Sequence, residues 1–192
     1  MGRMEADWEF ELGGDAPVIE AYWPGFIDLR EHPERVSELT ECRAFPSLAD
    51  VLIKLNAPDS PVWTSKTDVF TPATIDPDEM NASPEAAAHA LACYIDLLQR
   101  SHQVWNLPVD AERDCKQICA HLSVFGLRCC RVDIVVRRAL AGDTNELAAT
   151  VYLSACGPTL DDAKHQLGEC LAAFADVVAA PPSLSTRRAI RR

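Results

Sequence analysis

The sequence predicts an α+β fold, with a mostly antiparallel sheet that carries its helices on one face. Three observations predict it. Several segments alternate apolar and polar residues, which is the period of a strand with one buried face. Others place apolar residues three and four apart, which is the period of an amphipathic helix. A weak internal echo relates residues 26–29 to 94–97 and residues 66–69 to 131–134, each an alternating tetrapeptide with a central aspartate.

Length and composition fit one domain. The chain has 192 residues, of which 48% are hydrophobic and 24% are charged, as in ordinary globular proteins. We therefore expect a single α+β domain over residues 1–180. Residues 181–192 begin with two prolines and contain four arginines, so we expect them to form a flexible basic tail.

Charge and cysteine usage restrict the class of protein. The net charge of −11 repels phosphate backbones, so we expect no nucleic-acid partner. The acidic N-terminus has no apolar run of the secretory kind, and no stretch is apolar enough to span a bilayer, so we expect no membrane association. The eight cysteines are irregularly spaced. They therefore predict reduced thiols and a cytoplasmic protein.

The first thirty residues predict three strands. Residues 8–12 and 18–23 alternate apolar and polar side chains, and Gly13-Gly14 between them is a turn signal. We expect these two strands to pair as a hairpin. Residues 26–30 alternate again after Trp23-Pro24-Gly25, which breaks or bends the chain.

The middle of the chain predicts a helix, a strand and one ambiguous segment. A one-sided apolar stripe predicts a helix over residues 47–56, and residues 62–70 predict a strand. Ser83-Pro84 is a helix start. Two readings follow: this helix continues to Arg100, or it ends near residue 92 and a strand covers residues 93–100. The internal echo favours the strand.

The C-terminal third predicts a helix, a hairpin and a last helix. The first helix covers residues 110–125, with Gly126 at its C-terminal cap. Strands over residues 127–140 and 147–156 are joined by a turn-rich linker, which predicts a hairpin. The last helix starts at Thr159 and carries Asp161 and Asp162 in its first turn.

The order of these elements predicts the topology. From residue 26 to residue 140 the order is β-α-β, a spacer with one short helix, then β-α-β. This is the ferredoxin-like β-α-β-β-α-β arrangement, built as a pseudo-duplication of two similar halves. The N-terminal hairpin and the C-terminal strand extend the sheet, and the last helix adds cover.

Strand parity divides the side chains between the two faces of the sheet. One face is almost wholly apolar and is expected to pack on the helices; Trp63 is assigned to this face. The other face mixes charges and aromatic rings and is the predicted binding face. Its members are Asp28, Arg30, Lys66, Asp68, Tyr94, Asp96, Arg131, Asp133, Tyr152 and Ser154.

Three interpretations of the polar face compete. It is a solvated surface with cross-strand ion pairs, worth about 0–1 kcal/mol each. Alternatively, it is an interface for a second subunit or another protein, because the face also carries apolar members. The third interpretation is a small-molecule site where Lys66, Asp68, Arg131, Asp133 and Tyr152 converge.

Metal and cofactor motifs are weak. Four aspartates share the polar face, but Lys66, Arg131 and Arg30 neutralise them, so we expect no metal. Cys115 and Cys119 lie on an apolar helix stripe near His121, where core packing is the simpler interpretation. Glycine-rich nucleotide motifs are absent from the sequence, and no cofactor is predicted.

Cys156 is the candidate nucleophile. It ends a predicted strand just before a helix start, where backbone N–H groups and the helix dipole lower the pKa of a thiol. Asp161 and Asp162 oppose this effect, and His165 is the nearest following histidine. The alternative is a strand-end cysteine packed against Gly157-Pro158.

These observations predict a cytoplasmic, non-catalytic interaction module that self-associates, as a homodimer, or binds a protein partner through its polar sheet face. Two alternatives remain open. One is a small-molecule-binding protein or enzyme with its site on the same face. The other is a thiol-dependent enzyme that uses Cys156.

Overall fold

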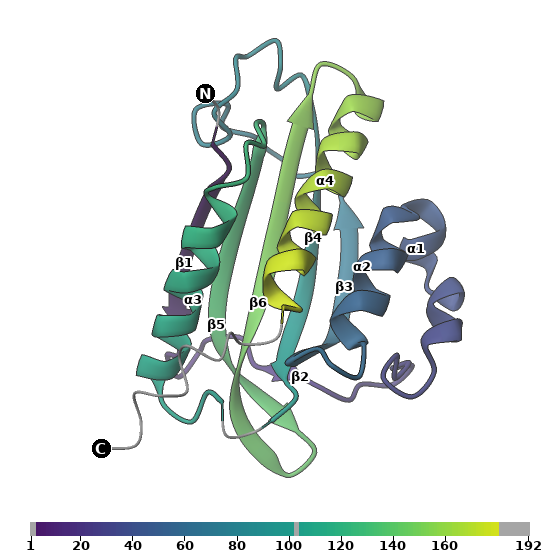
Figure 1. Ribbon diagram of the computed structural model, residues 1–192, viewed down its shortest axis with the longest axis vertical. Coiled ribbons are helices and arrows are strands. Elements are labelled where there is room, and N and C mark those ends of the chain that lie inside the picture. The colour runs from purple at the N-terminus through teal and green to yellow at the C-terminus, as the bar shows by residue number, and fades with distance from the viewer. Residues whose placement is uncertain (1–2, 102–103, 181–192) are drawn as a thin grey trace.

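Figure 1 shows the computed structural model of the protein, which describes residues 3–101 and 104–180. Its helices and sheet are consistent with the predicted α+β class. The elements in chain order are β1 (Glu5–Glu11), β2 (Ile19–Glu20), the 3₁₀ helix η1 (Pro33–Glu38), α1 (Thr40–Ala44), α2 (Ser47–Asn56), β3 (Val62–Phe70), β4 (His89–Gln99), α3 (Pro108–Leu122), β5 (Cys130–Ala141), β6 (Thr144–Gly157) and α4 (Leu160–Val178). The predicted basic tail lies outside the described residues.

The six strands form one mixed sheet. Its order is β1-β5-β6-β4-β3, and β2 also pairs with β5. The β3–β4, β4–β6 and β5–β6 pairs are antiparallel, whereas β1 and β2 both run parallel to β5. The predictions of a mostly antiparallel sheet and of an N-terminal hairpin are therefore wrong. The 12-residue β5 is long enough to pair with β1 and then with β2, which local sequence patterns cannot reveal.

Several elements confirm the sequence predictions. α2 and β3 have the predicted bounds, because the apolar stripe of α2 is buried and β3 pairs along its length with β4. The strand reading of residues 93–100 is confirmed as far as Gln99, where β4 ends. α3, the β5–β6 hairpin and α4 are present with shifted ends, and Thr159 caps α4 by accepting a hydrogen bond from the backbone N–H of Asp162 at 3.1 Å.

The helix predicted from Ser83 does not form. Residues 84–88 form turns, and β4 already begins at His89. The segment from His89 to Ala92 pairs with β6 from Ser154 to Gly157. These pairs extend the backbone hydrogen-bonding ladder, which outweighs the helix propensity of an alanine-rich segment.

Residues 26–30 are not a strand. Their backbone groups form turns, with the N–H of Phe26 on the carbonyl of Trp23 and the N–H of His32 on the carbonyl of Asp28, each at 2.9 Å. Without this strand the predicted β-α-β-β-α-β pseudo-duplication is not found. The chain instead contains two successive strand–strand–helix units, β3-β4-α3 and β5-β6-α4.

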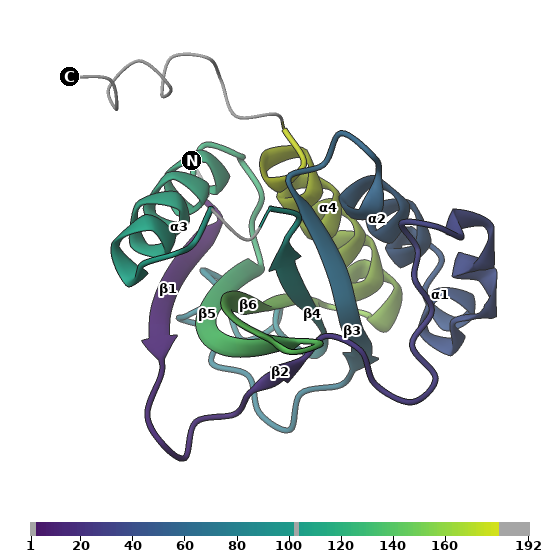
Figure 2. The ribbon, with the colours of Figure 1, turned by 90° about the horizontal axis from the view of Figure 1, so that it is seen from below.

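The helices cover one face of the sheet. Figure 2 shows α2, α3 and α4 on the same side, with β2 on the opposite side. α4 packs on β6 and β4, α2 packs on β3 and α4, and α3 packs on β1. Phe174, Leu153 and Leu167 are fully buried between these layers. Each such side chain contributes roughly 1.5–3 kcal/mol, so this layer supplies most of the stability.

Residues 26–30 pass beside β3 from one side of the sheet to the other (Figure 2). This path explains why apolar and polar residues alternate in the segment. Phe26 packs with the apolar cluster on the face opposite the helices, whereas Ile27 and Leu29 pack with the main core. Because the segment passes around β3, it limits access to an edge strand that would otherwise present free backbone groups.

Trp63 lies on the face opposite the helices, so its predicted side is wrong. A β-bulge between Thr64 and Thr67 shifts the register of β3 against β4. One extra residue in a strand moves every side chain before the bulge to the opposite face of the sheet from the one that simple alternation predicts. Trp63 is consequently 3% exposed in a second cluster with Leu98, which shares its face with Asp96.

Candidate functional site

The open face of the sheet is covered at one end by the β2 segment, which we define as residues 17–26. Ile19 and Ala21 of this segment pack with Trp63 and Leu98. Ser65 fixes the segment to β3, because its hydroxyl donates to the carbonyl of Ala21 at 2.8 Å. This end of the face is therefore closed by an apolar cluster.

The opposite end is covered by the 71–88 loop. Met80 of this loop packs against Ala90 and Cys156 in a third apolar cluster. Asn81 donates from Nδ2 to Oε1 of Glu5 at 2.7 Å, which joins the loop to β1. Among the described residues, the middle of the open face lies between these two covers.

A depression of about 200 Å³ lies beside the β2 segment in this uncovered middle. The sheet supplies its polar floor, and the β2 segment supplies one wall. The lining residues are Pro17, Val18, Ile19, Glu20, Lys66, Tyr94, Asp96, Arg137, Thr150 and Tyr152. Four strands and the β2 segment therefore contribute side chains to one hollow.

A hydrogen-bonded chain crosses the floor of the depression. Glu11 accepts from Nε and Nη2 of Arg137 at 2.7 and 2.6 Å. Nη1 of Arg137 donates to the hydroxyl oxygen of Thr150 at 3.0 Å, and this hydroxyl donates to Oδ1 of Asp96 at 2.6 Å. The chain orients the Thr150 proton toward Asp96 and fixes the carboxylate in place.

Asp96 is the most deeply buried carboxyl group of the site. Its residue is 6% exposed, and burial raises the pKa of Asp96 above the ordinary value of 3.8. The Thr150 hydrogen bond and the positive charges of Lys66 and Arg137 act in the opposite direction. Burying an ionisable group in a hollow is costly for stability, and such groups are concentrated at functional sites.

Two tyrosines and a lysine complete the depression. The rings of Tyr94 and Tyr152 lie 6.3 Å apart at 51°. Burial and the nearby Asp96 raise the pKa of Tyr94, which keeps its phenol protonated. Within the described part of the chain, the ammonium of Lys66 makes no ion pair and lies 5.9 Å from the Trp23 ring. Lys66 is thus available to a ligand anion.

The structure brings together part of the predicted binding face. Lys66, Tyr94, Asp96 and Tyr152 line the depression. Arg131 and Asp133 share the open face but pair with each other at 2.8 Å, and Arg131 also approaches Glu79 of the 71–88 loop at 3.9 Å. Asp68 is exposed on β3, and Ser154 is half-buried on β6.

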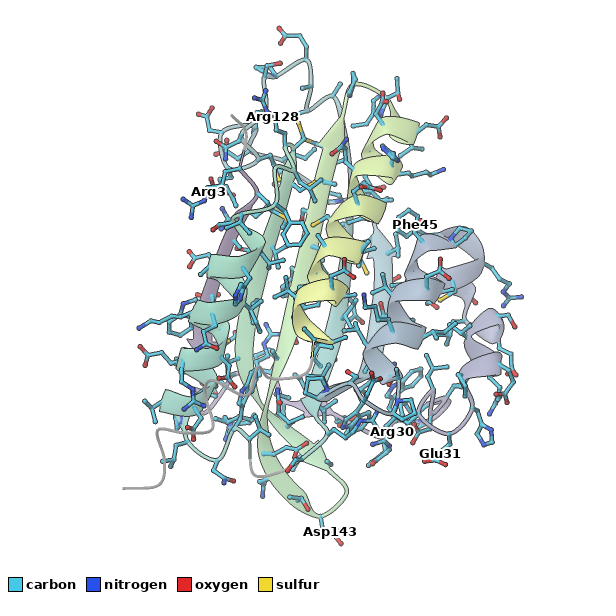
Figure 3. All side chains as sticks on the ribbon, in the orientation of Figure 1. Arg3, Arg30, Glu31, Phe45, Arg128 and Asp143 are labelled. Atoms are coloured by element: carbon cyan, nitrogen blue, oxygen red, sulfur yellow. The ribbon has the colours of Figure 1, made fainter. Side chains whose placement is uncertain are left out.

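Asp28 and Arg30 do not lie on a strand. They form an ion pair at 2.5 Å in the turn after Phe26, and Arg30 holds the pKa of Asp28 below its ordinary value. The Arg30 guanidinium carbon lies 3.8 Å from the centroid of the Trp63 ring. Figure 3 places Arg30 beside the end of the sheet that the β2 segment covers. The pair therefore belongs to this cover and not to the floor.

Four polar residues of the site were not among the predicted binding residues, and neither were the apolar residues Pro17, Val18 and Ile19. Arg137 and Thr150 have the same strand parity as Asp133 and Tyr152, so parity alone could have identified them. Glu11 and Glu20 reach the site only because β1 and β2 pair with β5. No local pattern in the sequence signals that pairing.

Cys156 does not have the environment predicted for a nucleophile. The residue is fully buried under the 71–88 loop, and burial raises the pKa of its thiol to about 12. Contact with Cys129 contributes to this rise. The thiolate is therefore disfavoured, and the alternative of a packed strand-end cysteine describes the geometry.

The remaining motifs belong to the core. Cys115 and Cys119 face the main cluster, where burial raises the pKa of these thiols to about 12 and about 11. The described residues contain no group of three or more histidine, cysteine or acidic side chains arranged to hold a metal ion. Across residues 3–101 and 104–180, no helix has both the length and the apolar character needed to cross a bilayer.

Comparison of the chain with protein-family models, with curated protein sequences and with solved structures gives no match. The functional argument therefore rests on the residues of the site.

Proposed function

We propose that this protein is a non-catalytic binding module that holds a small polar molecule in the depression on its open sheet face. The observation that carries the proposal is Asp96, a carboxylate 6% exposed at the floor of a hollow that two covers delimit. A buried charge lowers stability unless it is compensated, and a ligand that donates hydrogen bonds supplies that compensation.

The dimensions of the uncovered face favour a small molecule over a second protein chain. On β4, the 71–88 loop covers Ala90 and the β2 segment covers Leu98. Ala92, Tyr94 and Asp96 lie between these two covered positions. At ordinary strand rise and spacing this strip measures about 14 by 19 Å, or about 270 Å². A standard protein interface needs about 800 Å² on each partner. The size of the uncovered face therefore favours a small-molecule site over a homodimer interface.

The experiment is a ligand screen by nuclear magnetic resonance on the full-length, ¹⁵N-labelled protein. Single amino acids, nucleosides, monosaccharides and small carboxylates are added one at a time at millimolar concentration. Binding in the depression shifts the amide signals of Asp96, Thr150 and Tyr152 together, and leaves the exposed β5–β6 turn at Asp143 unchanged (Figure 3).

Two results would contradict the proposal. One is a screen in which no compound moves these amide signals. The other is a dimer by light scattering that Asp68→Lys or Asp133→Lys dissociates, because the open face would then be a protein interface.

A further inference from the structure

We infer that the ligand is a free α-amino acid with an apolar side chain, held with its ammonium group on Asp96 and its carboxylate on Lys66. This inference rests on the proposed function and specifies its ligand. It is carried by the juxtaposition of a buried carboxylate, an unpaired ammonium and an apolar wall within one depression.

The two charges that bind the ligand lie on two neighbouring strands, and the carboxylate of Glu20 also lines the depression. Asp96 lies on β4 and Lys66 on β3, next to the bulge that brings both Ser65 and Lys66 to the open face. Neighbouring strands are about 4.8 Å apart. The ammonium and carboxylate of an α-amino acid are attached to the same carbon atom, so their polar atoms are about 3 Å apart. Both ligand charges can therefore meet their opposite charges at once.

Arg137 is not the anion receptor of this arrangement. Its guanidinium already bonds Glu11 through Nε and Nη2, and Thr150 through Nη1. In the described part of the chain Lys66 lies over the Trp23 ring and its charge acts on Asp96, but it forms no ion pair. The free cation is thus Lys66, and Arg137 acts through Thr150 to position Asp96.

The rest of the depression selects an apolar side chain. Pro17, Val18 and Ile19 form one wall, and the tilted rings of Tyr94 and Tyr152 form part of the floor. The volume of about 200 Å³ is below the roughly 300–1,000 Å³ of sites for drug-sized ligands. An amino acid of the size of leucine suits this space.

Charge complementarity makes the site bind the zwitterionic amino acid more tightly than the matching amine or carboxylate, each of which carries only one of the two charges. An amine without a carboxylate places its positive charge beside Lys66 with no anion between them. A carboxylate without an amine places its negative charge beside Asp96. Each relative keeps the apolar contact and loses one favourable charge pair, which is worth about 1.5–3 kcal/mol or about a 10- to 100-fold change in affinity.

The test is calorimetric titration of the full-length protein with three matched probes: L-leucine, 3-methylbutylamine and 4-methylpentanoate. We expect L-leucine to bind about 10- to 100-fold more tightly than either relative. Asp96→Asn is expected to weaken L-leucine by a similar factor and to remove its advantage over 4-methylpentanoate. Lys66→Met is expected to remove the advantage over 3-methylbutylamine, and Asp68→Asn on the same face serves as the unchanged control.

The outcomes separate this inference from the proposed function. Equal binding of L-leucine and 3-methylbutylamine, or L-leucine binding that Asp96→Asn leaves intact, overturns the amino-acid inference. So does the absence of L-leucine binding when another compound of the screen shifts the Asp96 and Thr150 amides, and in that case the proposed function stands. If no compound shifts those amides, both fail.

Discussion

The hydroxyl of Thr150 donates to Oδ1 of Asp96 at 2.6 Å across the neighbouring strands β6 and β4. The same hydroxyl oxygen accepts from Arg137, so its single proton is directed to Asp96. This arrangement gives the buried carboxylate one strong partner, yet burial still raises the pKa of Asp96. The folded protein therefore keeps an ionisable group whose charged form lowers its stability, which is expected where stability is exchanged for binding.

The first prediction is that Asp96→Asn stabilises the protein at neutral pH while it weakens ligand binding. Asparagine keeps an oxygen that accepts from Thr150 and removes the buried charge. Because the folded pKa of Asp96 lies above the unfolded value of about 3.8, the penalty is present at neutral pH and disappears as the pH falls through the folded pKa. The stability gain of the variant should therefore vanish in acid.

Urea unfolding of both proteins from neutral pH down to the ordinary carboxyl range measures this difference. Asp68→Asn is the matched control, because Asp68 is an exposed carboxylate on the same face. Its free energy of unfolding should stay within about 0.5 kcal/mol of the wild type at every pH. A variant Asp96→Asn that is less stable at neutral pH would show that the charge of Asp96 is compensated within the fold.

The second prediction concerns Gly157, at the junction of β6 and α4. A Cβ atom placed there would lie 2.6 Å from Cβ of Asp162 and 2.7 Å from the backbone nitrogen of Ala163. Backbone atoms in the first turn of a buried helix cannot move away without shifting α4. We expect Gly157→Ala to destabilise the protein by about 1–3 kcal/mol.

Gly126→Ala provides the comparison, since nothing lies within 4 Å of a Cβ at that position. Thermal unfolding should show a lower Tm for Gly157→Ala and little change for Gly126→Ala. Equal Tm values for the two variants would contradict the close approach of strand and helix.

The sequence predicts an element of the fold correctly where a local pattern of apolar residues determines that element. The apolar stripe of α2 and the alternation of β3 predict their observed bounds, since each element buries one face. Residues 26–30 show the same alternation, yet they pass around the edge of β3 with Phe26 on one side and Leu29 on the other. A segment that places alternate side chains on opposite sides of a sheet shows the two-residue period of a strand, whether or not its backbone pairs with the sheet.

The site was predictable only in part for the same reason. Parity correctly places Tyr94, Asp96 and Tyr152 on the face opposite the helices. It fails for Trp63 because a bulge adds one residue, and a bulge has no reliable local signature. The wall that turns this face into a depression comes from β2, whose parallel pairing with β5 joins residues far apart in the sequence.

The third prediction concerns Trp63, which fixes the β2 segment to the sheet. Its ring packs with Ile19, stacks with Tyr22 at 5.6 Å and lies under Arg30. Trp63→Ala leaves a cavity in this cluster, and we expect it to destabilise the protein by about 3–5 kcal/mol. Val124, which is 79% exposed, is the control, and Val124→Ala should change stability by less than about 0.5 kcal/mol. Denaturant unfolding measures both, and a small effect of Trp63→Ala would contradict a firm attachment of the β2 segment.

The fourth prediction is that Cys156 resists alkylation in the folded protein. The thiol is buried beneath Met80, and burial raises its pKa to about 12, so both access and the thiolate fraction are low at neutral pH. Its neighbour Cys129 is half-buried and provides an internal comparison within the same cluster. Iodoacetamide labelling followed by peptide mass spectrometry should modify Cys129 first and Cys156 only after denaturation. Preferential labelling of native Cys156 would instead restore the interpretation of this residue as a nucleophile, because it would require an exposed thiolate at the end of β6.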